Sequence, residues 1–433
     1  MILLINNLIC TNRILPTRLN QTQRIMSNKE GNNETNLSFE TLCSREVKEL
    51  RYNKPHILPI YASSSFVFDN TEHSMSVFTN KEKGHLYSRY ANPTVDSVSQ
   101  KLAELETFDT EIKADCLLTN SGMSAISLVL TSQLKSGDKV LTQGDLYGGT
   151  TELLNKIYSN YNIEAITTDL TDTAKTEEIL KQNPDIAMIY AETPANPSLR
   201  CIDLTKLASL AKSYGVLTVV DNTFCTPYLQ RPLEHGIDIV IHSTTKSLNG
   251  HGNSIGGAVI ADQKFTDSLW TAYKLIGLNP SPFDAWLLHN GMKTLTLRVK
   301  QACFNALAIA QYLELNEDIS VVNYPGLPNH PSHQIACKQM SMFGSMLSFE
   351  LKGGFDAGKQ FMDSVNMITL APTLGDLDTL LLHPASSSHL NIDKAIREAN
   401  GITDGLIRMS VGIEDETDLI NDIRQAIHSI DKT

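Results

Sequence analysis

The chain has 433 residues, of which 41% are hydrophobic and 19% are charged, a composition typical of a globular protein large enough for more than one domain. Its formal net charge of -12 would repel nucleic acid and anionic membranes, so neither kind of partner is expected. No apolar run approaches the roughly 18 residues that a membrane-spanning helix requires.

The cysteines and the first residues bear on the compartment. The seven cysteines form no Cys-x-x-Cys pair and no even-numbered framework, which favours a reducing, cytoplasmic location over secretion. Residues 1–25 contain arginines but no acid, one feature of an organellar targeting segment. A translation start at Met26 explains the same residues, and both explanations are open.

The predicted elements suggest three regions along the chain. Residues 1–94 form an N-terminal extension and an arm with scattered proline and serine residues. The weak periodicity of the arm predicts that it packs on a surface outside the arm itself. Residues 95–293 contain the strongest strand and helix patterns. Residues 294–433 begin with a long helical stretch over 294–315 and continue as a mixed α and β tail, so we expect a smaller C-terminal domain there.

Short β-branched runs alternate with segments of helical period in the middle region. The predicted strands cover residues 140–142, 163–167, 186–192, 216–221, 237–243 and 255–260, and the predicted helices cover 150–160, 173–182 and 204–214. This alternation is typical of βα units on a large, mostly parallel sheet, which places the chain in the α/β class.

Lys246 follows directly on one of these strands, where open α/β sheets bind their ligands. Burial there would favour the neutral amine, which a Schiff-base nucleophile needs. A solvated loop lysine is the alternative. Ser243 and Thr245 flank Lys246 and offer hydroxyl groups to a phosphate, while Gly122 and Met123 open a predicted helix whose first amides can bind the same anion. Taken alone, the helix start is an ordinary N-cap.

Three further residues complete the candidate site. Asp221 ends a predicted strand and would keep a pyridinium nitrogen protonated, although an N-cap role explains it equally well. Tyr147 follows another strand end and would stack on an aromatic cofactor, whereas a turn tyrosine more commonly packs on the core. Arg408 lies in an apolar, strand-like run, where an anion such as a substrate carboxylate has to pair with it.

Two other motifs do not lead to a site. Gly250-His251-Gly252-Asn253-Ser254-Ile255 has isoleucine where the dinucleotide fingerprint requires its last glycine, so a nicotinamide cofactor is not predicted. His330 and His333 are separated by a helix-breaking proline and have no third ligand nearby, so no metal site is predicted.

Several motifs resemble, jointly and in order, the Cys/Met-metabolism family of pyridoxal-phosphate enzymes. They are Tyr87-Ser88-Arg89-Tyr90-Ala91-Asn92-Pro93-Thr94, Ser121-Gly122-Met123-Ser124-Ala125, Glu192-Thr193-Pro194-Ala195-Asn196-Pro197, Asp221-Asn222-Thr223-Phe224 and Ser243-Thr244-Thr245-Lys246. The likeness runs from about residue 57 to about residue 427. It implies the aspartate aminotransferase-like fold (fold type I), with a large cofactor-binding domain and a smaller C-terminal α/β domain.

The resemblance also implies a role for each residue and pyridoxal 5'-phosphate as cofactor. Lys246 would carry the Schiff base and Tyr147 would stack on the ring and act in catalysis. Asp221 would face the pyridine nitrogen, and Gly122, Met123, Ser243 and Thr245 would hold the phosphate. Asn196, Thr373 and Arg408 would position the amino-acid substrate. Tyr87 and Arg89 would reach the phosphate of a neighbouring subunit, which implies a homo-oligomer, a dimer with shared sites that assembles into a tetramer.

The subtype rests on departures from the pattern. In methionine γ-lyases the sequence around the stacking tyrosine resembles Leu-Tyr-Gly-Cys-Thr. In this chain, Gly149 stands in place of the cysteine. Cystathionine-processing members tend to have Leu-Ala-Glu-Ser-Leu-Gly, and here Pro372 replaces the acid. We expect a methionine γ-lyase-like enzyme that eliminates the γ-substituent of a sulfur amino acid. The alternatives are γ-replacement, an ordinary aminotransferase and a cofactor-binding protein without catalysis.

Overall fold

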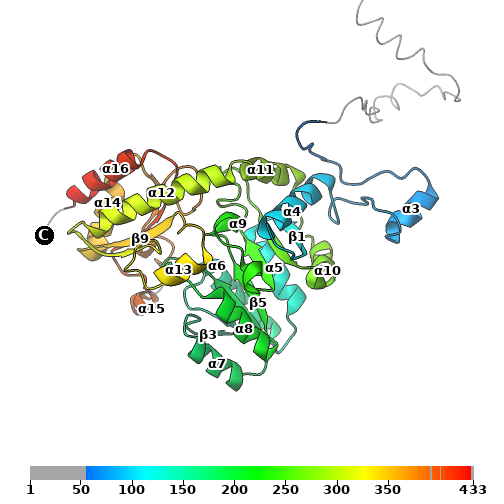
Figure 1. Cartoon of the computed structure of the whole chain (residues 1–433), viewed down its shortest axis with the longest axis horizontal. Helices are drawn as coiled ribbons and strands as arrows, with labels where there is room; N and C mark the ends of the chain where they lie inside the picture. The colour runs from blue at the N-terminus through cyan, green and yellow to red at the C-terminus, as the bar shows by residue number, and fades with distance from the viewer. Residues whose placement is uncertain (1–54, 391–392, 400, 431–433) are drawn as a thin grey trace, which may run out of the picture. The chain divides into compact units, whose positions relative to one another are not determined.

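The computed structural model describes residues 55–390, 393–399 and 401–430. Residues 57–433 form one compact unit (Figure 1). The expectations for residues 1–25 lie outside the described residues. None of the described helices is long and apolar enough to cross a membrane.

A seven-stranded sheet forms the first part of this unit. Its strand order is β1-β7-β6-β5-β4-β2-β3, with parallel pairing from β6 through β3 and antiparallel pairing of β7 with both β1 and β6. The strands are β1 (Ala114–Thr119), β2 (Lys139–Thr142), β3 (Glu164–Thr167), β4 (Ile186–Glu192), β5 (Leu217–Asp221), β6 (Ile239–His242) and β7 (Gly257–Asp262). The α/β class and the mostly parallel sheet are therefore confirmed.

Helices connect these strands, and α8 (Leu204–Tyr214) illustrates why they form. Asp203 caps its first turn by accepting a hydrogen bond from the Lys206 N–H, and Gly215 ends it at φ +68. The apolar residues of α8 recur with helical spacing and are buried. The other helices are α4 (Pro93–Glu106), α5 (Gly122–Gln133), α7 (Thr173–Gln182), α9 (Thr226–Leu229), η3 (Pro232–His235), η4 (Gln263–Phe265), α10 (Thr266–Ile276) and α11 (Pro282–Met292).

Two local predictions need correction. The expected helix over 150–160 consists of α6 (Gly148–Glu152), the π-helical turn η1 (Leu153–Ile157) and the 3-10 helix η2 (Tyr158–Tyr161). The Tyr158 hydroxyl is 2.8 Å from the Thr131 hydroxyl and donates to the Ser127 carbonyl at 3.1 Å, which ties this irregular segment to α5. The arm contains a helix that was not predicted, α3 (Thr71–Phe78), capped by Asn70.

A five-stranded sheet forms the second part, with strand order β10-β11-β12-β9-β8. Its strands are β8 (Ile319–Asn323), β9 (Met346–Leu351), β10 (Thr369–Leu370), β11 (Leu380–Leu382) and β12 (Leu406–Ser410). Helices α12 and α14 contact this sheet, and α16 packs against both of them (Figure 1). The helices of this part are α12 (Leu295–Glu314), α13 (His333–Gln339), α14 (Gly354–Ser364), η5 (Pro384–Ser386), α15 (Lys394–Ala399) and α16 (Glu416–His428).

Helix α12 belongs to the cores of both sheets. Its first half contributes Leu295, Val299 and Cys303 to the apolar cluster that contains β1 and β7 residues. Its second half contributes Ala306 and Leu313, among others, to the cluster beneath the five-stranded sheet. A single helix of 20 residues therefore joins the two parts.

Candidate active site

The carboxyl ends of parallel strands β4, β5 and β6 meet at one cavity, as expected for an open α/β sheet. The cavity has a volume of about 280 Å³. The predicted residues that line it are Gly122, Met123, Tyr147, Asn196, Asp221, Ser243, Thr245, Lys246 and Arg408. The folded chain thus gathers residues from four of the five motifs quoted above, together with Tyr147 and with Arg408 of the five-stranded sheet.

Lys246 lies in the turn after β6. The Lys246 N–H donates to the Ser243 carbonyl at 3.2 Å, and its own carbonyl accepts from the Gly250 N–H at 2.8 Å. The Lys246 Nζ donates to the Thr373 hydroxyl at 3.0 Å. Burial lowers the pKa of Lys246, and the positive charge of Arg408 lowers it further, whereas Asp376 opposes the shift. The amine therefore gives up its proton more readily than a solvated lysine.

Arg408 projects from β12 toward the same place. Its side chain is largely buried, and its Nη2 donates to the Thr373 carbonyl at 3.1 Å. Burial lowers the pKa of Arg408 to about 10, so the guanidinium stays cationic at neutral pH. Because a neutral carbonyl does not balance this charge, a carboxylate in the cavity would be strongly held.

Asp221 ends β5 on the floor of the cavity. Its Oδ1 accepts from the Thr223 N–H at 3.0 Å, and its Oδ2 accepts from the Tyr190 hydroxyl at 3.4 Å. Burial raises the pKa of Asp221, and the hydrogen bonds from Thr223 and Tyr190 offset this rise only in part. A cationic group above Asp221 would stabilise its carboxylate form.

The start of α5 forms an anion cradle. The Ser121 hydroxyl caps the helix by accepting from the Ser124 N–H at 3.1 Å, and the amides of Gly122 and Met123 have no partner within the helix. A Cβ on Gly122 would lie 2.9 Å from the Cβ of Ser243, so only glycine allows this approach. The Thr245 hydroxyl donates to the Gly256 carbonyl at 3.2 Å and would have to turn to reach a phosphate.

Tyr147 and Asn196 line the cavity, whereas Thr373 lies between the lining residues Pro372 and Leu374 without lining it. The Tyr147 side chain is 52% exposed and its ring lines the cavity. Asn196 lines the cavity from the loop that follows β4. Thr373 contacts both cationic residues, through its hydroxyl to Lys246 and through its carbonyl to Arg408.

Tyr87 and Arg89 do not line the cavity of their own chain. The Arg89 guanidinium donates to the Lys274 carbonyl and lies over the Tyr90 ring, 4.7 Å from its centroid. The Tyr87 side chain is 44% exposed. Tyr87 is thus exposed and Arg89 half-buried, and neither lines the cavity that most of the other candidates share.

Some cavity residues were not assigned a role from the sequence. Glu192 ends β4 just as Asp221 ends β5, so the strand-end argument applied to both positions. The remaining ones are mostly apolar and carried no chemical signal; they are Ser121, Ile126, Pro194, Thr223, Phe224, Ile255, Pro372 and Leu374.

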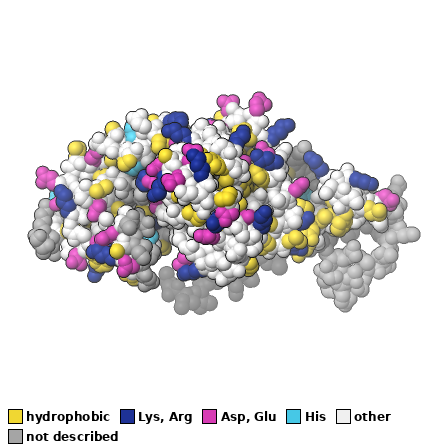
Figure 2. All heavy atoms as spheres, turned by 90° about the horizontal axis from the view of Figure 1, so that it is seen from below, with side chains coloured by type: hydrophobic (Ala, Val, Ile, Leu, Met, Phe, Trp, Pro, Cys, Tyr) yellow, Lys and Arg dark blue, Asp and Glu magenta, His cyan; other side chains and the backbone are white. Residues whose placement is uncertain are grey.

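Other kinds of site find little support. On the face seen in Figure 2, basic and acidic side chains are intermixed and form no continuous basic surface. Within the described ranges, no group of three or more His, Cys, Asp or Glu side chains is placed to hold a metal ion. A hollow of about 650 Å³ lies beside α4 and α10; Ser88 and Tyr90 are among its lining residues, and it shares none with the cavity.

The cavity fits the pyridoxal phosphate that the motifs imply. It combines a buried amine on Lys246, a buried acid on Asp221 and unpaired helix amides at Gly122 and Met123. These are the groups needed to hold an aldehyde carbon, a pyridine nitrogen and a phosphate. The half-exposed ring of Tyr147 offers an aromatic face on which the cofactor ring can stack.

Comparison with known proteins gives the same assignment. Residues 41–428 match the family model described as Cys/Met metabolism PLP-dependent enzyme. The chain is 42% identical over 380 residues to an L-methionine gamma-lyase of Fusobacterium nucleatum subsp. polymorphum, covering 86% of this chain and 93% of the relative. It is 37% identical over 393 residues to an O-succinylhomoserine sulfhydrylase of Pseudomonas aeruginosa, covering 91% and 96%.

A solved structure is also similar. The cystathionine gamma synthase of Xanthomonas oryzae pv. oryzae, in complex with aminoacrylate and cysteine, superposes with a TM-score of 0.80 at 40% identity, covering 86% of this chain and 92% of that one. This neighbour confirms the predicted fold type. The chain therefore belongs to the Cys/Met-metabolism family of enzymes, with pyridoxal phosphate as the cofactor.

Proposed function

We propose that this enzyme eliminates the γ-substituent of a sulfur amino acid such as methionine or cystathionine, releasing an α-keto acid, ammonia and a thiol. The observation that carries the proposal is the contact of Thr373 with both Lys246 and Arg408. One residue thereby brings a proton-accepting amine next to a cation suited to the substrate carboxylate.

Arg408 orients the substrate in this proposal. Its planar guanidinium can bind both oxygens of an α-carboxylate, and Asn196, which lines the same cavity, offers an amide. Because Arg408 is buried, water competes poorly for the carboxylate. The α-carbon of the substrate is then directed toward Lys246.

Lys246 moves the protons. Its lowered pKa increases the fraction of neutral amine, which takes a proton from the α-carbon, passes that proton on and, neutral again, takes one from the β-carbon. The Thr373 hydroxyl accepts a hydrogen bond from Nζ and so directs the amine. Tyr147 lines the cavity and is half-exposed, and its hydroxyl delivers a proton to the departing sulfur.

The cofactor supplies the electron sink for these proton transfers when it is bound. Asp221 would hold the proton of the pyridine nitrogen, and Tyr147 would cover the ring. The phosphate would be held by the amides of Gly122 and Met123 together with the hydroxyls of Ser243 and Thr245.

A γ-replacement reaction is the second candidate. The O-succinylhomoserine sulfhydrylase and the cystathionine gamma synthase named above favour it, since both names describe synthesis rather than elimination. The same residues serve both reactions, and the competition between water and a thiol decides the product. The replacement of the pattern's cysteine by Gly149 also bears on this choice. A Cβ there would lie 2.6 Å from Cε1 of Tyr147, so a side chain at 149 would displace the ring.

We further propose a dimer with shared sites, assembled into a tetramer. The support is that neither Tyr87 nor Arg89 lines the cavity of its own chain and that Tyr87 is exposed. We also propose a domain division at residues 94 and 293; the boundary at 293 is supported by the two sheets, which lie at 114–262 and 319–410 on either side of it.

The assay that tests the proposal offers purified protein methionine, cystathionine, and O-acetylhomoserine with sulfide, and measures keto acid, ammonia and thioether. Keto acid and ammonia from methionine or cystathionine are expected. Thioether or homocysteine formation without keto acid would replace elimination by γ-replacement. No turnover of any substrate would favour a cofactor-binding protein without catalysis.

A further inference from the structure

Glu192 is a buried acid in the cavity wall to which none of the steps above assigns a role. Both of its carboxylate oxygens lie 2.9 Å from the backbone N of Tyr147 and accept its N–H. The side chain of Gln143 fixes the Glu192 backbone, because Gln143 Nε2 donates to the Glu192 carbonyl at 2.9 Å and its Oε1 accepts from the Glu192 N–H at 3.0 Å. The acid is thus held rigidly against the start of the Tyr147 segment.

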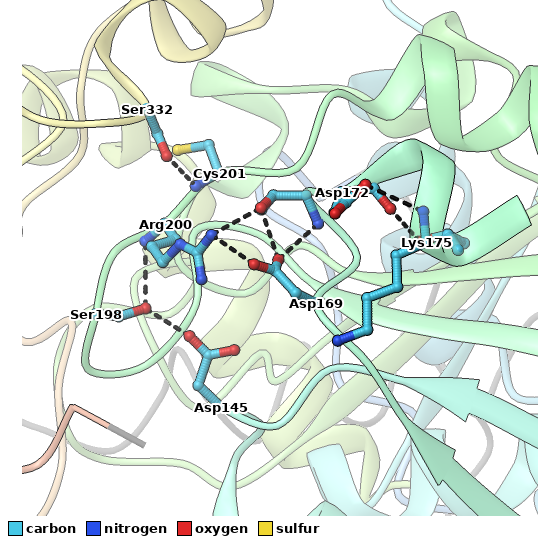
Figure 3. A network of polar contacts seen from close by, with 10 residues as sticks. Asp145, Asp169, Asp172, Lys175, Ser198, Arg200, Cys201 and Ser332 are labelled. Carbon is cyan, nitrogen blue, oxygen red and sulfur yellow. Dashed lines mark hydrogen bonds and ion pairs between the residues drawn. The ribbon is translucent and has the colours of Figure 1, made fainter. Parts of the chain in front are cut away.

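A second acid, Asp145, connects the Tyr147 segment back to the loop that follows β4. Asp145, two residues before Tyr147, accepts a hydrogen bond from the Ser198 hydroxyl at 2.5 Å. Ser198 lies two residues after Asn196, in the loop that follows β4. Figure 3 shows Asp145 and Ser198 facing each other, with Arg200 beside them. Arg200 continues the network by donating to Asp169 at 2.9 Å.

We infer that Glu192 and Asp145 are positioning residues that lock the Tyr147 loop and the Asn196 loop to each other. We call these two contacts, Glu192 to the Tyr147 N–H and Asp145 to the Ser198 hydroxyl, the loop latch. Glu192, which precedes the Asn196 loop, accepts a hydrogen bond from the Tyr147 loop, and Asp145, which precedes Tyr147, accepts one from the Asn196 loop. A shift of either loop would therefore break a hydrogen bond close to its cavity residue. The functional consequence rests on the proposed roles of Tyr147 and Asn196.

The position of Glu192 argues against a purely structural acid. Burial raises the pKa of Glu192 well above its usual range, and the negative charge of Asp221 raises it further. An apolar residue would be less costly at a buried strand end. The carboxyl group instead faces the one N–H that precedes the stacking ring, where an error of about 1 Å in ring position would impair binding of the cofactor.

Four variants test the loop latch. Glu192→Ala removes the acceptor of the Tyr147 N–H. Glu192→Gln keeps one acceptor oxygen on a side chain of similar shape. Ser198→Ala removes the hydroxyl that donates to Asp145. The matched control is Glu164→Gln, an acid whose side chain is 67% exposed on β3. Each variant is compared with the wild-type chain for its melting temperature first, so that only folded proteins are compared further.

The first readout needs neither cofactor nor substrate. In cofactor-free protein, amide hydrogen exchange at Tyr147 should become about tenfold faster or more in Glu192→Ala, because the N–H loses its acceptor. Glu192→Gln should exchange nearly as slowly as wild type. Ser198→Ala should accelerate exchange in the segment around 196–200. The control Glu164→Gln should change neither segment.

The second readout uses the loaded enzyme. Glu192→Ala should weaken cofactor binding about tenfold and change the visible circular dichroism of the bound cofactor, with partial rescue in Glu192→Gln. Unchanged exchange at Tyr147 and an unchanged dichroism band in folded Glu192→Ala would overturn the inference. If Glu192→Ala does not fold, wild-type exchange around 196–200 in Ser198→Ala would overturn it.

The exchange result is independent of the reaction. If no sulfur amino acid is turned over but exchange at Tyr147 accelerates as described, the loop latch stands and the proposed function fails. If turnover is found and exchange is unaffected, the proposed function stands and the loop latch fails.

Discussion

Lys246 and Thr373 lie 127 positions apart in the chain, yet the Nζ of the first is 3.0 Å from the hydroxyl of the second. Lys246 follows a strand of the seven-stranded sheet, whereas Thr373 precedes β11 in the five-stranded sheet. The reacting amine is therefore directed by a residue from the other half of the molecule.

Removing this hydroxyl should slow the reaction without abolishing it. We expect Thr373→Ala to lower kcat/KM by about tenfold to a hundredfold, the range for loss of one hydrogen bond to a charged group. Thr373→Ser retains the hydroxyl and should stay close to wild type. The Thr373 carbonyl that binds Arg408 is present in both variants. Equal steady-state kinetics for the two variants would show that the hydroxyl does not direct the amine.

Lys246→Ala should remove both the yellow colour of the bound cofactor and the turnover. The loss of turnover should reach at least about a thousandfold, because the chain's proton-transfer group is deleted. Absorbance spectra of the purified variant and a keto-acid assay measure the two effects. Lys264→Ala, which changes a lysine with a 58% exposed side chain, serves as control and should retain both. Full activity in Lys246→Ala would refute the assignment.

Arg408→Ala should raise KM strongly and cost about 2–5 kcal/mol in kcat/KM, the range for removing one partner of a buried charge pair. Arg408→Lys should recover only part of this loss, since a lysine cannot bind both carboxylate oxygens in one plane. Steady-state kinetics at several substrate concentrations separate KM from kcat. A kinetically silent Arg408→Ala would show that the carboxylate is bound elsewhere.

Shared sites predict complementation between two inactive variants. Lys246→Ala and Arg89→Ala chains should each be inactive or nearly so alone. A two-fold axis means that each chain supplies its Arg89 to the site of the other chain. In a mixed dimer, one site therefore carries both changes and the other carries neither. Refolding the chains together should therefore restore activity. Hybrids that form, as shown by mass spectrometry, but remain inactive would contradict the shared-site arrangement.

The cysteines should differ sharply in reactivity with pH. Burial raises the pKa of Cys201 and of Cys303 to about 12, so their thiolate fraction stays small until the pH approaches that value. Cys337 is exposed. Between pH 7 and 9, iodoacetamide should therefore label Cys337 in the native protein and reach Cys201 and Cys303 only after unfolding. Peptide mass spectrometry before and after urea treatment checks this, and native labelling of Cys201 would contradict it.

The sequence was most informative where local pattern determines structure. Strands β2 to β6 and helices α7 and α8 lie within two residues of their predicted bounds, because burial alternation and capping residues such as Asp203 act locally. The antiparallel placement of β7 beside β1 was not predictable, since strand pairing depends on distant segments. The bond of Glu192 to the Tyr147 amide was missed for the same reason.

Because α12 inserts Val299 into one core and Ile309 into the other, the two sheets share a rigid rod rather than a flexible joint. Any closure that carries Arg408 nearer to Lys246 must tilt the C-terminal half of this rod or bend it. Such a bend would fall between Cys303, the last α12 residue in one core, and Ala306, the first in the other.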